Sequence, residues 1–587
     1  MAVQTKAQRF FNLTAAEVKT DSVVPHFCHT EPLPDNYRDS VYTVSIAYPE
    51  FIDMPATDVS NYRRHHSALP PAMPELETNI VFNRRKPFIS TSFCPVVYRS
   101  GKYQLLVSFL LKRDASVKGG AKNSAPKRKT DVAPAERYAA HSVLATGKWV
   151  KIRVSASGFH QITESLIRKV GFSDINKVKL YGYGGNLKNE ILNADDLINT
   201  DDLKEVPTYK SGNRRVFYAR GPVSWASNTS TVRTRNPYSD YGYYFLTESA
   251  DAPTTVDAAA MAADTYPTPD DFHSHYEVDA YSWYNGGRNL FDSHSVEPGS
   301  SRTVNIAAPN TDGDQKLVVC VSAGRSCVVQ VEVNDSIVGT VRTSLGDSKY
   351  IFGCRKSATF TVRNIKADNA VKLTVLEGAA MRLDYITLVS PEPRPMPDLD
   401  SESLPVPEYV YGITNQDRHA DPQADLVIII PTSQKLLKQA QRLKTFHEER
   451  DGLRVNIVPA DELYNEFSSG TPDASAYRHY MKMLYDRAAD EKDMPKYLLL
   501  FGDCVWDNRM LTPQCRNLNP DDYLLAFESE ESFDKRSCYI DDGFYAMLDD
   551  GEGAKPLWVD KLEVAVGRFP VPPEQGAKGL VDKTSAY

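Results

Sequence analysis

The chain has 587 residues, a formal net charge of −8 at pH 7 and an isoelectric point of about 5.9. This acidic balance creates no field that would attract nucleic acid, so we expect no nucleic-acid partner. The longest apolar runs, Leu105–Leu111 and Leu426–Ile430, are far shorter than the roughly 20 residues of a membrane-spanning helix. We therefore expect no membrane-spanning segment, and the length predicts about three to five domains.

The cysteines and the first residues carry little information about the cellular compartment. Eight cysteines are spread through the chain without the spacing of a zinc site. Cys320, Cys327 and Cys354 fall in one β-rich region, where free thiols are favoured over a disulfide. Residues 1–30 lack the apolar centre of a secretory signal, so we expect no signal peptide in this sequence.

Alternating, β-branched segments dominate the first 390 residues. They predict an N-terminal β domain over 1–112, a second β-rich domain over 136–274 and a β-sandwich over 275–390. A basic stretch with Gly, Ser and Pro predicts a flexible linker over 113–135. A proline-rich stretch predicts an extended linker over 391–410.

Three features of these β regions have structural or functional interpretations. Trp149–Thr163 predicts a strand hairpin broken at Ser157-Gly158. Ser282–Gly287, with Trp283 and Tyr284, fits either a sugar platform or a core corner, and the corner is favoured. His273 and His275 alternate on one strand face, but no third metal ligand is visible.

Apolar strands and helix-like segments alternate from Asp425 onward. Strands are predicted at Asp425–Ile430, Leu453–Pro459 and Lys496–Asp503, with helices at Ser433–Arg450 and Asp473–Ala489 between them. This order predicts a parallel, doubly wound sheet. The predicted fold is therefore multidomain, with N-terminal all-β domains, including a β-sandwich, followed by an α/β domain.

The motifs DLVIIIPT, RVNIVP, YLLLFGD, IDDGFYAMLDD and VAVGRFPV follow one another over Asp425–Val571. With Gly567-Arg568-Phe569-Pro570 before a helix-like Glu574–Tyr587, this order resembles the first half of a gingipain-type cysteine peptidase domain of the caspase-like clan. The resemblance covers residues 35–587 and is strongest after 410. It implies an incomplete α/β peptidase domain over 411–587.

The resemblance also implies a function. It suggests a cysteine-type endopeptidase of the type IX secretion system that removes C-terminal sorting signals of secreted cargo and attaches the cargo to the cell surface. The implied partners are secreted proteins with C-terminal sorting domains and other type IX secretion components, at the bacterial cell surface or outer membrane. The family's His-Gly and Cys motifs would lie beyond Tyr587, so we expect no catalytic residue and no activity in this chain alone. The alternative is a non-catalytic surface protein with β-sandwich binding modules and an α/β docking region.

Asp503 is the candidate metal ligand of the chain. A carboxylate after Gly502 at a strand end can hold a hard cation with loop carbonyls, or accept from backbone N–H groups of the next turn. The resemblance implies a structural calcium ion there and no cofactor for the chemistry. Cys504, although adjacent, is on the wrong strand for the family nucleophile. His447 and His479 lie on helix-like segments, where surface histidines are ordinary.

Four further carboxylates bracket a predicted short strand, namely Asp541, Asp542, Asp549 and Asp550. They suit either a cation or two acidic turns. A sheet of this extent would leave a strand edge and one apolar helix face uncovered, so 410–587 should be loose on its own, whereas 1–400 should fold.

Overall fold

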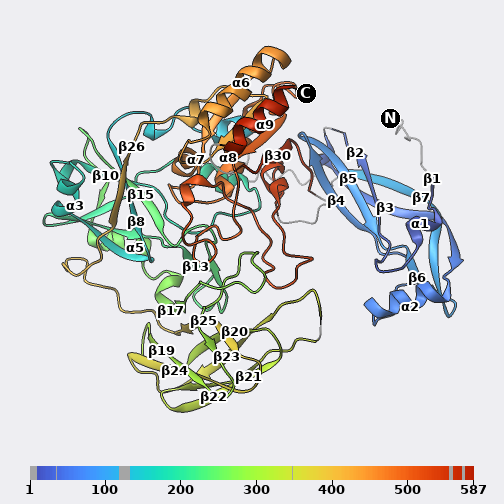
Figure 1. The fold of residues 1–587 in the computed structure, drawn as a ribbon, viewed down its shortest axis with the longest axis horizontal. Helices are drawn as coiled ribbons and strands as arrows, with labels where there is room; N and C mark the ends of the chain where they lie inside the picture. The colour runs from blue at the N-terminus through green and yellow to red at the C-terminus, as the bar shows by residue number, and fades with distance from the viewer. Residues whose placement is uncertain are drawn as a thin grey trace. The chain divides into compact units, whose positions relative to one another are not determined.

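The structure, a computed structural model, describes residues 10–34, 36–117, 133–346, 348–553, 560–571 and 575–586. It divides the chain into an N-terminal unit, residues 1–131 with 549–563, and a main unit, residues 132–548 with 564–587 (Figure 1). Most of the linker predicted at 113–135 lies outside the described residues. Within the described parts, none of the helices has the length and apolar character needed to span a membrane.

The N-terminal unit is built from two antiparallel sheets. One contains β1 (Phe10–Asn12), β7 (Lys102–Val117) and β3 (Ser40–Asp53), with β6 (Val96–Arg99) also paired to β7; the other contains β2 (Phe27–Pro32), β5 (Lys86–Phe93) and β4 (Glu77–Asn83). Two short helices, α1 (Ala15–Val18) and α2 (Ala56–His65), accompany them. Phe93, Leu106 and Phe109 form a core of this unit.

Two four-stranded sheets form the first part of the main unit. The first has the strand order β10 (Val178–Tyr181), β15 (Gly242–Glu248), β8 (Trp149–Val154) and β26 (Glu408–Ile413). The second has the order β16 (Thr255–Val256), β11 (Thr208–Ser211), β12 (Arg214–Ala219) and β9 (Gly158–Thr163). The predicted hairpin of β8 with β9 is therefore wrong. Each strand pairs within its own sheet, and Ile152 and Ile162 meet in one shared core. The accompanying elements are α3 (Glu164–Lys169), α4 (Ala194–Asn199), α5 (Ala258–Thr265) and the hairpin of β13 (Val223–Trp225) with β14 (Arg233–Arg235).

The predicted β-sandwich is confirmed. One sheet has the strand order β17 (His273–Glu277), β25 (Met381–Val389), β20 (Gln315–Ala323) and β23 (Cys354–Val362), with β18 (Ser295–Val296) also paired to β25. The other has the order β19 (Ser301–Ala307), β24 (Asp368–Gly378), β21 (Cys327–Val333) and β22 (Ser336–Arg342). Val319 and Ile386 of one sheet share a core with Val331 and Leu373 of the other. The alternation of apolar residues that predicted these strands buries the facing sides of both sheets.

The parallel sheet is also confirmed. Its order is β28 (Val455–Pro459), β27 (Leu426–Ile430), β29 (Tyr497–Phe501) and β30 (Ala565–Phe569). Helices α6 (Leu437–Asp451) and α9 (Gln575–Ala586) lie side by side over one face (Figure 1). Helices α7 (Ala460–Phe467) and α8 (Ser475–Arg487) cover the other face. Sequence reasoning did not predict α7.

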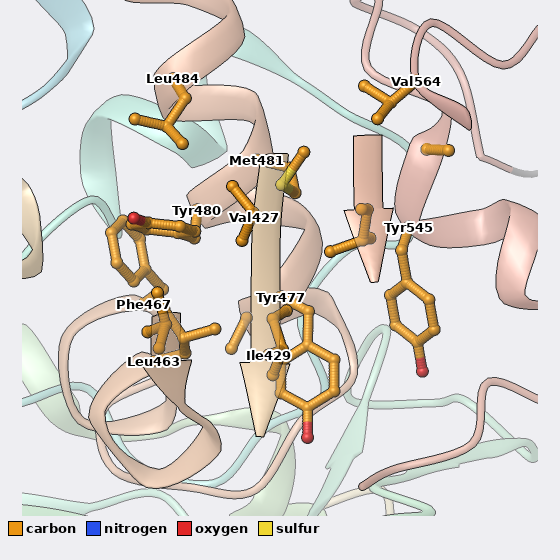
Figure 2. Close-up of a cluster of buried hydrophobic side chains, with 14 of the residues drawn as sticks. Val427, Ile429, Leu463, Phe467, Tyr477, Tyr480, Met481, Leu484, Tyr545 and Val564 are labelled. Atoms are coloured by element: carbon orange, nitrogen blue, oxygen red, sulfur yellow. The ribbon is translucent and has the colours of Figure 1, made fainter. Parts of the chain in front are cut away.

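Strand β27 is apolar throughout because successive side chains serve different layers. Val427 and Ile429 pack against α7 and α8 beside Tyr477 (Figure 2). Ile428 and Ile430 belong to the core under α6 and α9. Both faces of the sheet are therefore buried, as the continuous run of apolar residues indicates.

Helix α8 has no solvent-facing side, since every residue from Ser475 to Asp486 is buried. Its outer side contacts earlier parts of the main unit. Asp486 accepts a hydrogen bond of 2.9 Å from the Tyr138 hydroxyl, and Arg478 donates one of 2.6 Å to the Glu190 carbonyl. In the whole chain the β-rich region thus covers this helix face, which residues 410–587 alone would leave uncovered.

The regions expected at 136–274, 275–390 and 411–587 belong to the main unit, except for residues 549–563, which belong to the N-terminal unit. The proline-rich segment between the last two is packed on β9 and β12, since Gln161 donates to the Glu402 carbonyl at 2.7 Å and Arg214 to the Ser401 carbonyl at 2.6 Å. The chain then continues as β26, which completes the sheet of β8.

His419 joins the β-rich and α/β regions through two carboxylates. Its Nδ1 lies 2.6 Å from Glu466 and its Nε2 lies 3.1 Å from Asp201, while the ring stacks on Phe467 at 4.6 Å. Burial opposes the charged form, but the two carboxylates outweigh it and raise the pKa of His419 to about 10. The buried imidazolium therefore links segments that are far apart in the sequence through two ion pairs.

We predict that these His419 ion pairs make the free energy of unfolding depend on pH. The folded pKa of about 10 exceeds the unfolded value near 6.5, so the stabilisation is complete below pH 6.5 and is lost as pH rises through 10. The free energy of unfolding of the wild type should fall across this range by up to roughly 1.4 kcal/mol per pH unit relative to His419→Gln. Urea titrations at several pH values measure this, with His447→Gln on the helix α6 surface as the control. Parallel pH profiles for wild type and His419→Gln would contradict the prediction.

We also predict that residues 410–587 alone stay loosely packed or aggregate. Removal of the β-rich region takes the Tyr138 hydroxyl from Asp486 and the Glu190 carbonyl from Arg478, and it exposes the outer side of α8 to water. Limited proteolysis with size-exclusion chromatography tests this. A monomeric, protease-resistant fragment that unfolds cooperatively would show that the sheet does not need the β-rich cover.

Candidate functional site

The carboxyl edge of the parallel sheet contains a topological switch point. The chain leaves β27 toward β28 and leaves β29 toward β30, so the connections diverge between β27 and β29. Open α/β sheets bind ligands in the crevice outside such a point. The two strand ends approach closely here, because a Cβ atom at Gly502 would lie 2.7 Å from Cγ of Pro431.

A cavity of about 270 Å³ lies at this point, and we call it the switch-point cleft. Its α/β wall includes Thr432, which follows β27, and Val505, which follows β29. Its β-rich wall includes Tyr241 and Tyr243. The cleft therefore exists only where the two regions of the main unit meet.

The switch-point cleft is aromatic with charges at its rim. Arg153 lies 4.0 Å above the Tyr241 ring and donates a 2.9 Å hydrogen bond to Glu408. Burial raises the pKa of Asp521, and the neighbouring Asp522 adds to the shift. Among the described residues, neither a histidine nor a cysteine lines the cleft. Its lining offers aromatic faces and hydrogen-bonding groups to a ligand, but its described residues include no cysteine with a neighbouring histidine to act as nucleophile and general base.

Behind the cleft, Lys151 is buried beneath the aromatic wall. Its ammonium lies 4.7 Å from the Tyr243 ring centroid and donates to Asn465 at 3.1 Å. Burial lowers the pKa of Lys151 to about 8, although Asp461 and Asp521 oppose the shift. Sequence reasoning missed Lys151, because nothing in its strand distinguishes a lysine that faces the α/β region from one that faces water.

Asp503, the predicted calcium ligand, acts as a turn cap. Its Oδ1 accepts a 2.9 Å hydrogen bond from the Cys504 amide, and its carbonyl accepts one of 2.9 Å from Leu524. In the described part of the chain, the one group of three or more possible metal ligands is Asp549, Glu552 and Glu563, which belongs to the N-terminal unit. Calcium binding at Asp503 stays a prediction.

The four carboxylates that suit either a cation or two acidic turns belong to different units, Asp541 and Asp542 to the main unit and Asp549 and Asp550 to the N-terminal unit. Asp541 accepts from the Gly543 amide at 2.8 Å and opens a 3₁₀ turn, Asp542–Ala546, where a strand was predicted wrongly. Asp542 binds Arg568 through two hydrogen bonds of 2.7 and 2.9 Å. Asp549 lies instead with Glu552, whose pKa burial raises to about 7, and Asp550 is exposed.

Cys504 is not arranged as a nucleophile. Burial raises the pKa of its thiol to about 11, and the nearby Arg568 offsets only part of that shift. No described histidine forms a hydrogen bond with its sulfur. The thiol stays protonated at neutral pH, so it lacks the thiolate that peptide-bond attack requires.

The histidines singled out from the sequence have structural contacts, with one exception. His447 lies 2.7 Å from Asp451 at the end of α6. The ring nitrogens of His273 face the carbonyls of Pro269 and Ser230 at 2.6 and 2.8 Å, so they do not point to a shared metal with His275. His479 is the exception: it is buried in α8, and the expectation of a surface histidine is wrong.

The Ser282–Gly287 segment is a core corner. Trp283 donates from Nε1 to the Ser322 hydroxyl at 3.0 Å. A Cβ atom at Gly324 or Gly353 would lie 2.9 Å from its ring, so the indole is packed between these glycines. The favoured interpretation of this segment agrees with these contacts.

We predict that Cys504 is slow to react with iodoacetamide at pH 7.5, because the reagent attacks the thiolate. Cys28, an exposed cysteine of the same chain, is the internal reference. Peptide mass spectrometry after timed alkylation should show Cys504 modified at least tenfold more slowly than Cys28. Equal rates would contradict the assignment of Cys504 as an unreactive thiol.

Comparisons with known proteins agree with this fold. Residues 419–587 match the model of peptidase family C25. A search of curated proteins finds no match. The crystal structure of dimeric latent PorU from Porphyromonas gingivalis is similar with a TM-score of 0.62 and 28% identity, covering 76% of this chain and 50% of that chain. This chain thus spans about half the length of that PorU chain.

A family 35 carbohydrate-binding module from Clostridium thermocellum also matches, with 19% identity over 20% of this chain and 88% of that chain. Its TM-score of 0.15 is too low to support an argument. The family model, the PorU match and the parallel sheet agree with one another. Residues 419–587 therefore resemble peptidase family C25, the gingipain family of cysteine peptidases, in both sequence and fold.

Proposed function

We propose that this chain is the amino-terminal portion of a PorU-type cysteine endopeptidase of the type IX secretion system. The whole protein removes the C-terminal sorting signals of secreted cargo and attaches the cargo to the bacterial surface. Its partners are cargo proteins with C-terminal sorting domains and other type IX secretion components. The observation that carries the proposal is the PorU match over 76% of this chain, together with the family match at residues 419–587.

In such an enzyme a Cys thiolate attacks the scissile carbonyl, a His carries the proton, and backbone N–H groups hold the oxyanion. If an amine replaces water as the second nucleophile, the same acyl-enzyme gives transpeptidation. We assign neither the Cys nor the His to residues 1–587. The protonated Cys504 and the histidine-free switch-point cleft support that assignment. The part described here supplies the sheet and a cleft for a polypeptide segment.

The test begins with the transcript downstream of the codon for Tyr587. We expect a strand followed by His-Gly and a later strand followed by Cys. The 587-residue chain and the extended chain are then assayed with a cargo protein that carries its sorting domain. Only the extended chain should cleave, its activity should be lost on alkylation, and its Cys504→Ser variant should cleave at the wild-type rate.

Two outcomes would overturn the proposal. Cleavage by the 587-residue chain that Cys504→Ser abolishes would show that the nucleophile has been misassigned. A stop codon directly after Tyr587 would favour the alternative, a non-catalytic surface protein whose β modules bind a glycan or a partner.

A further inference from the structure

A second cavity, of about 500 Å³, lies in the β-rich part of the main unit, and we call it the β17 groove. All five residues of β17 line it, together with 155–157 between β8 and β9, 305–307 at the end of β19, and Trp225 of β13. Strand β17 is at the edge of its sheet, which has the order β17, β25, β20 and β23. Because neighbouring residues of a strand point to opposite faces, a cavity lined by all five lies along the strand's edge.

The hydrogen-bond pattern of β17 leaves backbone groups on this edge without partners. The Ser390 amide donates to the Phe272 carbonyl at 2.9 Å, so these two residues form a hydrogen-bonded pair of the antiparallel ladder. Such pairs alternate along antiparallel strands, so the N–H and C=O groups of His275 and Glu277 point away from β25. None of the described residues forms a hydrogen bond with these four backbone groups.

The backbone of Glu277 is also accessible. Its side chain is only 1% exposed, since Arg233 donates to it at 3.0 Å, whereas the residue as a whole is half-buried. The exposed part of Glu277 is therefore its backbone. Backbone groups that are both accessible and unpaired at a sheet edge are a template for a further strand.

The charged side chains that line the groove are Arg235, Asp240, Asp270, Glu277 and Arg394. Arg235 lies 2.6 Å from Asp240 and 3.3 Å from Glu277. Arg394 lies 3.9 Å from Asp271, and Asp270 accepts a 3.4 Å hydrogen bond from the Tyr218 hydroxyl. Each of these charged groups thus has a polar partner within the protein, so the lining favours a ligand with uncharged side chains.

The two faces of β17 meet different walls of the groove. On one face, His273 and His275 contact the Trp225 ring at centroid distances of 4.0 and 5.6 Å. On the other face, Tyr276 packs against the core of the sandwich, to which β19 belongs. A strand added beside β17 would therefore direct alternate side chains toward Trp225 and toward β19.

We propose that the β17 groove binds an extended polypeptide segment with uncharged side chains, which adds to β17 as a further strand. The segment exchanges hydrogen bonds with the outward N–H and C=O groups of His275 and Glu277. Alternating donors and acceptors at this spacing match another strand, whereas a saccharide has no such alternation. Strand addition to an open sheet edge is a recurring mode of peptide recognition. The inference does not rest on the proposed function, because no residue of β27–β30 lines the groove.

Affinity selection with mass spectrometry on the full 587-residue chain tests this with two peptide libraries. Both contain N-acetyl pentapeptide amides of uncharged residues, since β17 can pair with roughly five residues at about 3.3 Å each. In the second library the third and fourth residues are N-methylated, so a central donor is lost whichever side of the peptide faces β17. We expect the protein to retain peptides of the first library and at least fivefold less of the second.

Variants locate the binding. Ala307→Trp fills the groove from an exposed position and should lower retention of the first library at least fivefold, whereas Ala250→Trp, exposed outside the groove, should leave it unchanged. Proline is tolerated on edge strands where its nitrogen faces outward. His275→Pro should therefore fold and retain at least fivefold less than His275→Ala, which keeps the N–H.

Three results would overturn the proposal. The first is equal retention of the two libraries, which would show that backbone hydrogen bonds are not used. The second is unchanged retention in Ala307→Trp, which decides the question even if His275→Pro fails to fold. The third is retention of neither library, and binding of maltotriose in their place would identify a saccharide site instead.

Discussion

Complete burial of helix α8 is the constraint on which the main unit depends. One side of the helix must be apolar to cover β27, and its other side carries Arg478, Lys482 and Asp486 into the interior. A buried charge without a partner lowers the free energy of unfolding by several kcal/mol, on the order of 3–5 kcal/mol. That is a large share of the total stability of a domain. Lys482 pairs with Asp486 at 2.7 Å, and Arg478 reaches backbone carbonyls. The β-rich region therefore completes the α/β region.

This dependence explains why the two regions are joined at several places. Strand β26 adds to the sheet of β8, and the His419 imidazolium lies between Asp201 and Glu466. Both ties hold the segment before β27 against the β-rich sheets. The switch-point cleft lies between the same two regions, because its tyrosine wall belongs to one region and Thr432 to the other.

The polar residues at the carboxyl edge are already committed to structural roles. Asp503 caps its own turn, Asp542 holds Arg568, and Arg568 lies against the loop that carries Cys504. Because these side chains are held in contacts within the fold, they can position neighbouring residues but are not free to act as catalytic groups. This agrees with the proposal that residues 1–587 provide the frame of a peptidase.

Strands and helices whose residues follow a regular period could be predicted from the amino-acid order alone. The apolar run Leu426–Ile430 and the alternating sandwich strands were recognisable because the pattern of apolar residues along a strand shows which of its faces are buried. Asp503 and Cys504 were located correctly at a strand end. The fold was needed to show that β8 and β9 join different sheets, that 549–563 belongs to the N-terminal unit and that His479 is buried. Strand partners, counter-ions and cavity walls come from residues far apart in the chain, so no local pattern specifies them.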